Sequence, residues 1–153
     1  QTSAAFDGSS WTINGTKAFI TGGGIADVAL VVAQTDKSKG IRGITLFIVP
    51  TNTQGYSSTE VHGKMGMHCA DLAHINLTDC RIPSENRLGE IGQGMRIALQ
   101  SISNARLSIA AGCVGGAQRC LDVSIDYARQ RRQFRRPIGS FQLVQSVLAD
   151  MAT

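Results

Sequence analysis

The sequence predicts an α+β protein in which a small antiparallel β-barrel or sandwich domain is followed by one long helix and the start of a second, a truncated helical bundle. Three observations lead to this prediction. The 153 residues are 42% apolar, which is enough to bury the core of one ordinary domain or of two small ones. The spacing of apolar residues changes after Pro83 from the strand period to the helix period. The helical pattern stops at Thr153, soon after a second helix begins.

The strongest turn signal of the first half is the pair Asn14-Gly15. Both residues tolerate the positive φ of a tight turn, so residues 11–21 predict a β-hairpin. The glycines at 22–24 are expected to end its second strand in a turn, because no Gly-Lys-Ser/Thr follows them as in a phosphate-binding loop.

Three further stretches of the first half are typical of strands. Nearly continuous apolar runs at 28–33 and 44–49 predict two strands that are buried on both faces. Residues 73–82 alternate between apolar and polar side chains, which predicts a strand with one buried face.

Apolar residues then recur every three or four positions, with no proline before Pro137, which predicts one helix of roughly 35 residues. Its stripe consists of Ala98, Ile102, Ala105, Ile109, Cys113, Ala117, Leu121, Ile125 and Ala128. Pro137 and Gly139 end this helix, and Ser140 is expected to cap a second one at 141–151. A helix this long cannot bury its stripe against a small β domain alone, so we expect partner helices and a homo-oligomer.

Composition excludes several classes of protein. Charged residues are only 17%, and Gly and Pro together are 20 of 153, so neither a disordered nor a collagen-like chain fits. No membrane span or signal segment is recognised, which predicts a soluble, cytoplasmic protein without a membrane partner. Four cysteines without a CxxC pair predict free thiols, and the spacing of the His and Cys residues between 62 and 80 does not favour a metal site.

The net charge of +4 comes from one place. Residues 1–88 are neutral in sum, whereas five arginines lie between Arg129 and Arg136. A basic cluster of this kind suits a nucleic-acid binder, but few aromatic residues and no nucleic-acid-binding fold signature accompany it, so we expect no nucleic-acid partner.

An ordered series of motifs resembles the acyl-CoA dehydrogenases, flavoproteins that oxidise acyl-CoA thioesters to 2-enoyl-CoA. The series begins with WTINGTKAFIT at 11–21 and continues through GITLFIV at 43–49, KMGM at 64–67, NRLG at 86–89, and the helical residues Arg106, Arg131, Phe134, Pro137-Ile138 and Phe141-Gln142. The resemblance implies that residues 1–88 are the family's middle β domain. Residues 89–153 would be the opening helices of its C-terminal helical domain, which is incomplete.

The resemblance also implies two groups of FAD-binding residues. Phe19, Ile20 and Thr21 stand where the family contacts the flavin ring, although from the residues alone Phe19 would be a core residue and Thr21 a cap. The second group, Arg131, Phe134 and Gln142, stands where the family reaches the FAD of a neighbouring subunit. The arginines could equally be a solvated helix end that offsets the helix dipole. Arg135 replaces the glycine that the family usually has.

For the substrate, the resemblance places Ser103, Asn104 and Arg106 in the acyl-CoA pocket. The alternative for Arg106 is a buried arginine paired with a carboxylate of another helix. In some family members a glutamate base precedes this arginine, but Ala105 occupies that place here and cannot accept a proton. We therefore name no catalytic residue.

These observations predict a segment of a flavin-dependent acyl-CoA dehydrogenase that is inactive by itself and binds FAD weakly or not at all. Acyl-CoA, a homo-oligomeric partner and an electron-transfer flavoprotein are the partners that the resemblance implies, and the mitochondrial matrix replaces the cytoplasm if the source is eukaryotic. The alternative is a non-catalytic, self-associating fragment or decayed copy.

Overall fold

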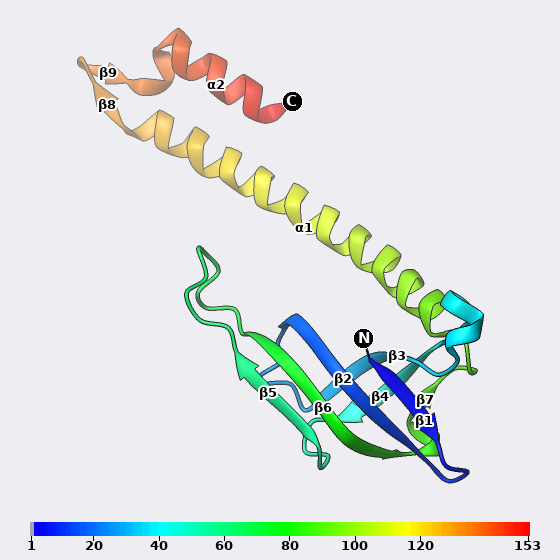
Figure 1. The fold of residues 1–153 in the computed structure, drawn as a ribbon. Coiled ribbons are helices and arrows are strands. Elements are labelled where there is room, and N and C mark those ends of the chain that lie inside the picture. The colour runs from blue at the N-terminus through cyan, green and yellow to red at the C-terminus, as the bar shows by residue number, and fades with distance from the viewer. Residues whose placement is uncertain (1) are drawn as a thin grey trace. The chain divides into compact units, whose positions relative to one another are not determined.

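The structure, a computed structural model, describes residues 2–153, which divide into two compact units between Ser101 and Ile102. The first unit holds a seven-stranded sheet (Figure 1). Its strands are β1 (Ser3–Phe6), β2 (Ser10–Thr21), β3 (Val28–Gln34), β4 (Ile44–Pro50), β5 (Tyr56–Glu60), β6 (Leu72–Pro83) and β7 (Arg87–Leu88), and 3₁₀ helices span Lys37–Gly43 and Ser84–Asn86. The expected β domain is therefore present.

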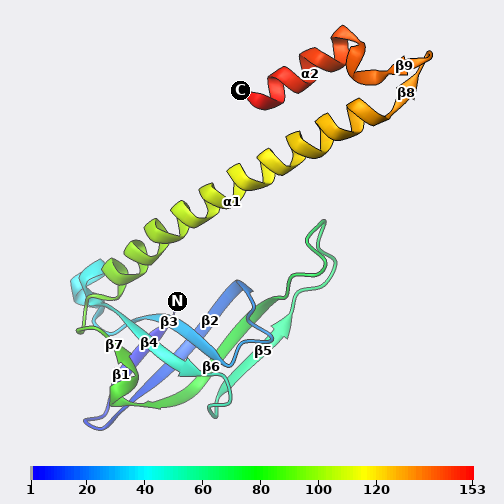
Figure 2. The same cartoon turned by 180° about the vertical axis from the view of Figure 1, so that it is seen from behind.

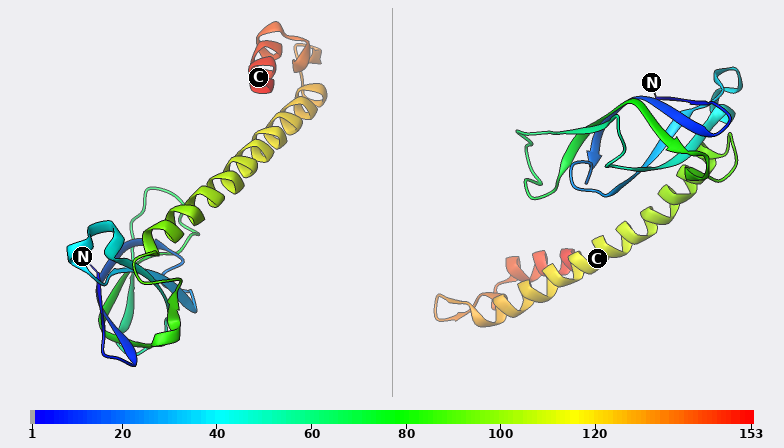
Figure 3. Two further views of the ribbon diagram at one scale, coloured as in Figure 1. Left: turned by 90° about the vertical axis from the view of Figure 1, so that its right-hand side faces the viewer. Right: turned by 90° about the horizontal axis from the view of Figure 1, so that it is seen from below.

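The sheet order is β5-β6-β2-β1-β3-β4-β7. All neighbouring strands are antiparallel except β1 and β3, which run parallel and meet at Ser3 and Gln34. The sheet curls around its own apolar face (Figure 3). The fold is the expected mainly antiparallel β domain, with this one parallel pair added.

One apolar cluster forms the core of the sheet. Its buried members are Ala4, Trp11, Ile13, Val31, Ala33, Phe47, Val49, Ile75, Leu77, Cys80 and Ile82. The alternation predicted for residues 73–82 is confirmed, because Ala73, Ile75 and Leu77 are buried. Strand β3 differs from the prediction: only one of its faces is buried, and Leu30 on the other face is 63% exposed.

The hairpin predicted at Asn14-Gly15 is wrong. Strand β2 continues through both residues, and the turn of the first hairpin lies before Ser10, where the Asp7 carboxylate accepts hydrogen bonds from the backbone. Gly15, with φ of 141°, marks a bulge in the pairing of β2 with β6. The Asn14 side chain is used to hold Asp79 across this bulge, donating to its carboxylate at 3.0 Å and accepting from its N–H at 2.8 Å.

The long helix is confirmed as α1 (Gly94–Gln130), which has 37 residues, and a second helix is α2 (Gln142–Ala152) (Figure 2). The sequence pattern missed a small hairpin between them, formed by β8 (Arg132–Gln133) and β9 (Arg136–Pro137). The cap predicted at Ser140 is wrong. Ser140 lies in the 3₁₀ turn Ile138–Ser140, where its hydroxyl donates to the carbonyl of Pro137, and Phe141 is the N-cap residue of α2 without a side-chain cap bond.

Most apolar side chains of α1 in the second unit are exposed among the described residues. Leu107 is 76% exposed and Val114 is 71% exposed, whereas Ala128 is buried. An open apolar groove of about 420 Å³ lies between the end of α1 and α2, and its lining includes Tyr127, Ile138 and Leu148. The second unit thus leaves much of its apolar surface uncovered, which agrees with the need for partner helices.

Candidate functional site

The end of β2 presents Phe19 to solvent. Phe19 has a φ of 56° and lies in a bulge, because the pairing with β6 shifts between Lys17 and Ile20. Its ring is 67% exposed, so the alternative of a core phenylalanine does not hold in the described structure. Thr21 ends the strand and is also exposed, whereas Ile20 is half-buried and packs on the core.

His74 of β6 supports this strand end, a role that no motif in the sequence indicates. The Phe19 N–H donates to Nδ1 of His74 at 3.4 Å, and the two rings meet edge to face with centroids 5.1 Å apart. A neutral imidazole that accepts at Nδ1 carries its proton on Nε2. The contact therefore orients both rings at the exposed end of β2.

The glycine run after Thr21 is a turn, as expected. Gly22 has a φ of 73°, and its N–H donates to the carbonyl of Asp71 at 3.1 Å. A Cβ on Gly24 would lie 2.7 Å from Oδ1 of Asp71, whose carboxylate accepts from the Gly24 N–H at 2.8 Å. The hydrogen bonds from the glycine turn to Asp71 therefore fix the backbone beside Thr21.

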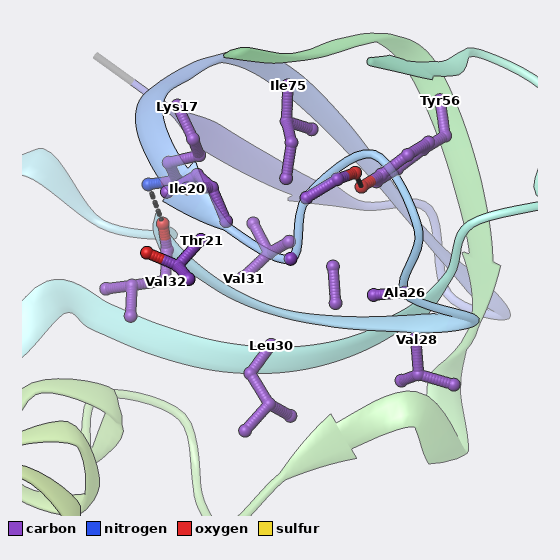
Figure 4. Close-up of a pocket in the computed structure, with 13 residues that line it drawn as sticks. Lys17, Ile20, Thr21, Ala26, Val28, Leu30, Val31, Val32, Tyr56 and Ile75 are labelled. Atoms are coloured by element: carbon purple, nitrogen blue, oxygen red, sulfur yellow. Dashed lines mark hydrogen bonds between the residues drawn. The ribbon is translucent and has the colours of Figure 1, made fainter. Parts of the chain in front are cut away.

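A cavity of about 370 Å³ opens beside the same strand end (Figure 4). Its lining comes from β2, the glycine turn, β3 and the core residues Tyr56 and Ile75. The amine of Lys17 reaches across it and donates to the carbonyl of Val32 at 2.6 Å. Burial lowers the pKa of Lys17 below its ordinary value, because the charged amine loses hydration.

In the second unit, the β8–β9 hairpin gathers the other predicted cofactor residues. Phe134 and Arg135 form its two-residue turn with φ of 51° and 67°, the positive values that a type I′ turn requires. Arg131 lies just after α1, and its carbonyl accepts from the N–H of Ile138 at 2.8 Å. Gln142 is the first residue of α2, so the hairpin brings Arg131, Phe134 and Gln142 into one local segment.

The hairpin concentrates positive charge beside exposed aromatic rings. All five arginines from Arg129 to Arg136 are exposed, and no ion pair within residues 2–153 includes any of them. The Phe134 ring is 86% exposed and meets Phe141 edge to face at 6.1 Å, while the guanidinium of Arg136 lies 4.1 Å above the Phe141 ring. Guanidinium groups without acidic partners suit a pyrophosphate, and open aromatic faces suit a ring system.

The predicted substrate residues lie elsewhere on α1. Ser103, Asn104 and Arg106 are all exposed, and no ion pair among the described residues includes Arg106. Arg106 and Arg131 are 25 positions apart, which corresponds to about 37 Å along a helix. The substrate group and the hairpin group are therefore separate within the second unit.

Neither a metal centre nor a membrane span is found in the part of the chain that the structure describes. No group of three His, Cys, Asp or Glu side chains within residues 2–153 is placed to hold a metal ion. None of the helices there is long and apolar enough to cross a membrane. All four cysteines are free thiols, as predicted.

A β unit with a curled sheet and a helical unit, with an exposed aromatic strand end on the first and a basic hairpin on the second, define a two-domain α+β protein. The family model for the middle domain of acyl-CoA dehydrogenases matches residues 1–80, and the model for their C-terminal domain matches residues 92–153. The chain belongs to the acyl-CoA dehydrogenase family, which confirms the resemblance read from its motifs.

Individual relatives agree. The chain is 41% identical over 145 residues to the short-chain specific acyl-CoA dehydrogenase of Megasphaera elsdenii, with 95% of this chain and 38% of the relative covered. It is 42% identical over 151 residues to the mitochondrial short-chain specific enzyme of Rattus norvegicus, with 99% and 37% covered. The solved structure of butyryl-CoA dehydrogenase from Megasphaera elsdenii superposes with a TM-score of 0.91 at 40% identity, over 99% of this chain and 40% of that one. The chain thus spans about two fifths of the length of these relatives.

Proposed function

We propose that this chain supplies part of the FAD- and acyl-CoA-binding site of an acyl-CoA dehydrogenase. The observation that carries the proposal is the β8–β9 hairpin, which holds Arg131 and the open ring of Phe134 next to Gln142 with no acidic partner among the described residues. The named relatives, which act on acyl-CoA thioesters by their names, support the same assignment.

The residues present fit a flavin dinucleotide in their chemistry. Arg131 would offer its planar fork of N–H donors to the pyrophosphate of the FAD of a neighbouring subunit. Phe19 would stack its exposed face on the flavin ring, and the Thr21 hydroxyl would donate a hydrogen bond to the ring edge. Bound FAD would accept the β-hydride of the acyl chain, which is the redox chemistry that no side chain supplies.

For the substrate, we assign Ser103, Asn104 and Arg106 to the thioester side of the site. All three side chains are exposed, and the Arg106 guanidinium would favour the negative charge of an acyl-CoA. Ala105 cannot remove the α-proton, so we propose that this polypeptide alone does not turn over acyl-CoA.

A titration of the purified chain with FAD, followed by flavin fluorescence up to millimolar protein, tests the cofactor assignment. We expect weak binding, and we expect Arg131→Ala to raise the dissociation constant by about tenfold to a hundredfold, because a hydrogen bond to a charged group contributes about 1.5–3 kcal/mol. The matched control is Arg119→Ala, which removes the same charge from an exposed position of α1.

Equal dissociation constants for the two variants would contradict the role of Arg131. A submicromolar constant that Arg131→Ala abolishes would show that the chain is a self-sufficient flavin module and would contradict the expectation of weak binding. Turnover of an acyl-CoA with an artificial electron acceptor by the FAD-loaded chain would contradict the absence of a base.

A further inference from the structure

The bulge near the end of β2 places two residues opposite one residue of β6. Between Lys17 and Ile20, strand β2 has one residue more than the facing part of β6, so Ala18 and Phe19 both lie opposite His74. A bulge of this kind bends its strand and changes the direction of a side chain. Here the Phe19 ring is turned outward and is largely exposed.

The imidazole of His74 takes the place of a ladder partner for the extra residue. In a regular antiparallel ladder a backbone N–H donates to a carbonyl of the neighbouring strand, but a bulge leaves the extra residue unpaired. The Phe19 N–H donates instead to Nδ1 of His74 at 3.4 Å, and the two rings meet with centroids 5.1 Å apart. Phe19 has a φ of 56°, in the left-handed region that bulky residues rarely adopt. One side chain thus contacts both the backbone and the ring of a residue in an uncommon conformation.

Only the neutral form of His74 can make the hydrogen bond. A neutral imidazole has a lone pair at Nδ1, whereas an imidazolium carries a proton on each ring nitrogen and has no acceptor. Histidine side chains change between these forms in the range of about pH 5–8. Protonation of His74 would therefore remove the acceptor of the Phe19 N–H.

The residues that face His74 from the two neighbouring strands carry no charge. They are Ala18 and Phe19 of β2 and Thr59 of β5. The charged groups nearest along these strands contact other groups: Lys17 the carbonyl of Val32, Glu60 the ring of His62, and Asp71 the N–H of Gly24. No ion pair within residues 2–153 includes His74. The protonation of His74 itself therefore decides whether this hydrogen bond forms.

We propose that His74 is a positioning residue that holds Phe19 at the end of β2 only while its imidazole is neutral, so that this strand end responds to pH. The consequence for the cofactor rests on the proposed function, which assigns Phe19 to the flavin ring. Protonation of His74 would release the backbone of Phe19 and weaken the binding of FAD.

Hydrogen exchange of the Phe19 amide, measured by NMR across about pH 5–8, tests the contact without any cofactor. We expect its protection factor, corrected for the intrinsic pH dependence of exchange, to fall about twofold to tenfold as the ring resonances of His74 titrate. His74→Asn places an amide oxygen, which does not titrate, near the position of Nδ1, so its protection should not change with pH. His74→Phe keeps a ring but has no acceptor, so its protection should be low at every pH.

The matched control is His62→Gln, which removes the exposed histidine beside Glu60 on the same side of the sheet order. This variant should keep the pH dependence of the Phe19 amide. A pH dependence that persists in His74→Asn, or that disappears in His62→Gln, would overturn the proposal.

FAD titrations at about pH 5.5 and about pH 8 test the consequence for the cofactor. The dissociation constant at the lower pH, divided by that at the higher pH, should be about twofold to tenfold larger for the parent chain than for His74→Asn. Equal ratios beside a pH-dependent Phe19 amide would overturn the cofactor consequence and the assignment of Phe19 to the flavin, but not the contact itself. Failure of the proposed function is therefore distinct from failure of the pH-dependent contact.

Discussion

Arg135 holds a backbone conformation that suits glycine. Its φ of 67° lies in the left-handed region, where a side chain costs roughly 1–2 kcal/mol, and it follows Phe134 at 51° in the same turn. The sequence raised the question whether an arginine in place of the family's glycine would change the loop. The tight turn is still formed, and the backbone of Arg135 is strained as a result.

We therefore expect Arg135→Gly to increase the free energy of unfolding of the helical unit by about 0.5–1 kcal/mol, after the added chain entropy of glycine is subtracted. Urea unfolding monitored by circular dichroism measures this change in the free energy of unfolding. Arg129→Gly is the control, since it removes the same charge inside α1 and should lower stability by about 1 kcal/mol. A lower stability of the Arg135→Gly variant would mean that contacts of the arginine side chain stabilise the unit by more than the backbone strain destabilises it.

The turn at Asp7 makes an acid-dependent contribution. Hydrogen bonds from the backbone N–H groups of Ser9 and Ser10, with a smaller contribution from Arg81, hold the pKa of Asp7 at about 2. A lowered pKa stabilises the fold fully above the unfolded value near 4, and this stabilisation is lost as the pH falls through the folded value. The loss thus occurs between about pH 4 and pH 2.

We expect Asp7→Asn to be less stable than the parent chain at pH 7 and the difference to shrink as the pH falls from about 4 toward 2. Melting temperatures measured across this range provide the readout. Asp27→Asn, which removes the same charge on another exposed loop, serves as the control. A difference in melting temperature between the parent chain and Asp7→Asn that does not change with pH would show that the charge of Asp7 does not contribute to stability.

At the level of elements, the bulge of β2 replaces the expected hairpin. Asn14-Gly15 satisfies the local requirement of a tight turn, yet the neighbouring β6 offers a full antiparallel ladder along residues 10–21. Pairing along most of the strand satisfies more backbone groups than a turn would, and Gly15 lies at the first of the two register shifts. Local turn chemistry was overridden by a strand that lies far away in the sequence.

The Asn14–Asp79 contact should stabilise this bulge. We expect Asn14→Ala to lower the free energy of unfolding of the β unit by about 1 kcal/mol, because two hydrogen bonds across the bulge are lost at exposed positions. Tryptophan fluorescence of Trp11 during urea unfolding measures the change. Asn52→Ala, at an exposed turn, is expected to have an effect within about 0.5 kcal/mol, and an equally small effect of Asn14→Ala would contradict the assignment.

For the whole molecule, the exposed apolar side chains of α1 predict self-association. Leu107 and Val114 lie seven residues apart on one face of the helix and are largely exposed. Apolar patches of several hundred Å² rarely persist on monomers. We expect the chain to be at least dimeric at micromolar concentration, as measured by light scattering.

The double variant Leu107→Glu/Val114→Glu should shift the chain toward the monomer. The matched control is Ser101→Glu/Ser108→Glu, which introduces the same charges at the same spacing on exposed polar positions. A stable monomer of the parent chain at high concentration would refute the prediction, and so would equal dissociation by both double variants.

Sequence alone determined the class of fold, the long helix and the family. The helix period, the alternation at 73–82 and the ordered motifs are local properties of the chain, so no tertiary contact is needed to recognise them. The positions of the cofactor and substrate groups came from the resemblance to the family and stay predictions. The turn that orders Arg131, Phe134 and Gln142 was not recognised, because Phe134 and Arg135 are unusual residues for positive φ.

Only the tertiary structure decided how distant strands pair. It turned the expected hairpin at Asn14 into a continuous strand, exposed Phe19 at a bulge against His74, and inserted β1 between β2 and β3. Each of these features depends on which strand lies alongside. The residues of one strand specify which of its faces is apolar, but they do not specify the neighbouring strand. The cavity beside Lys17 also depends on that pairing, because its lining comes from both β2 and β3.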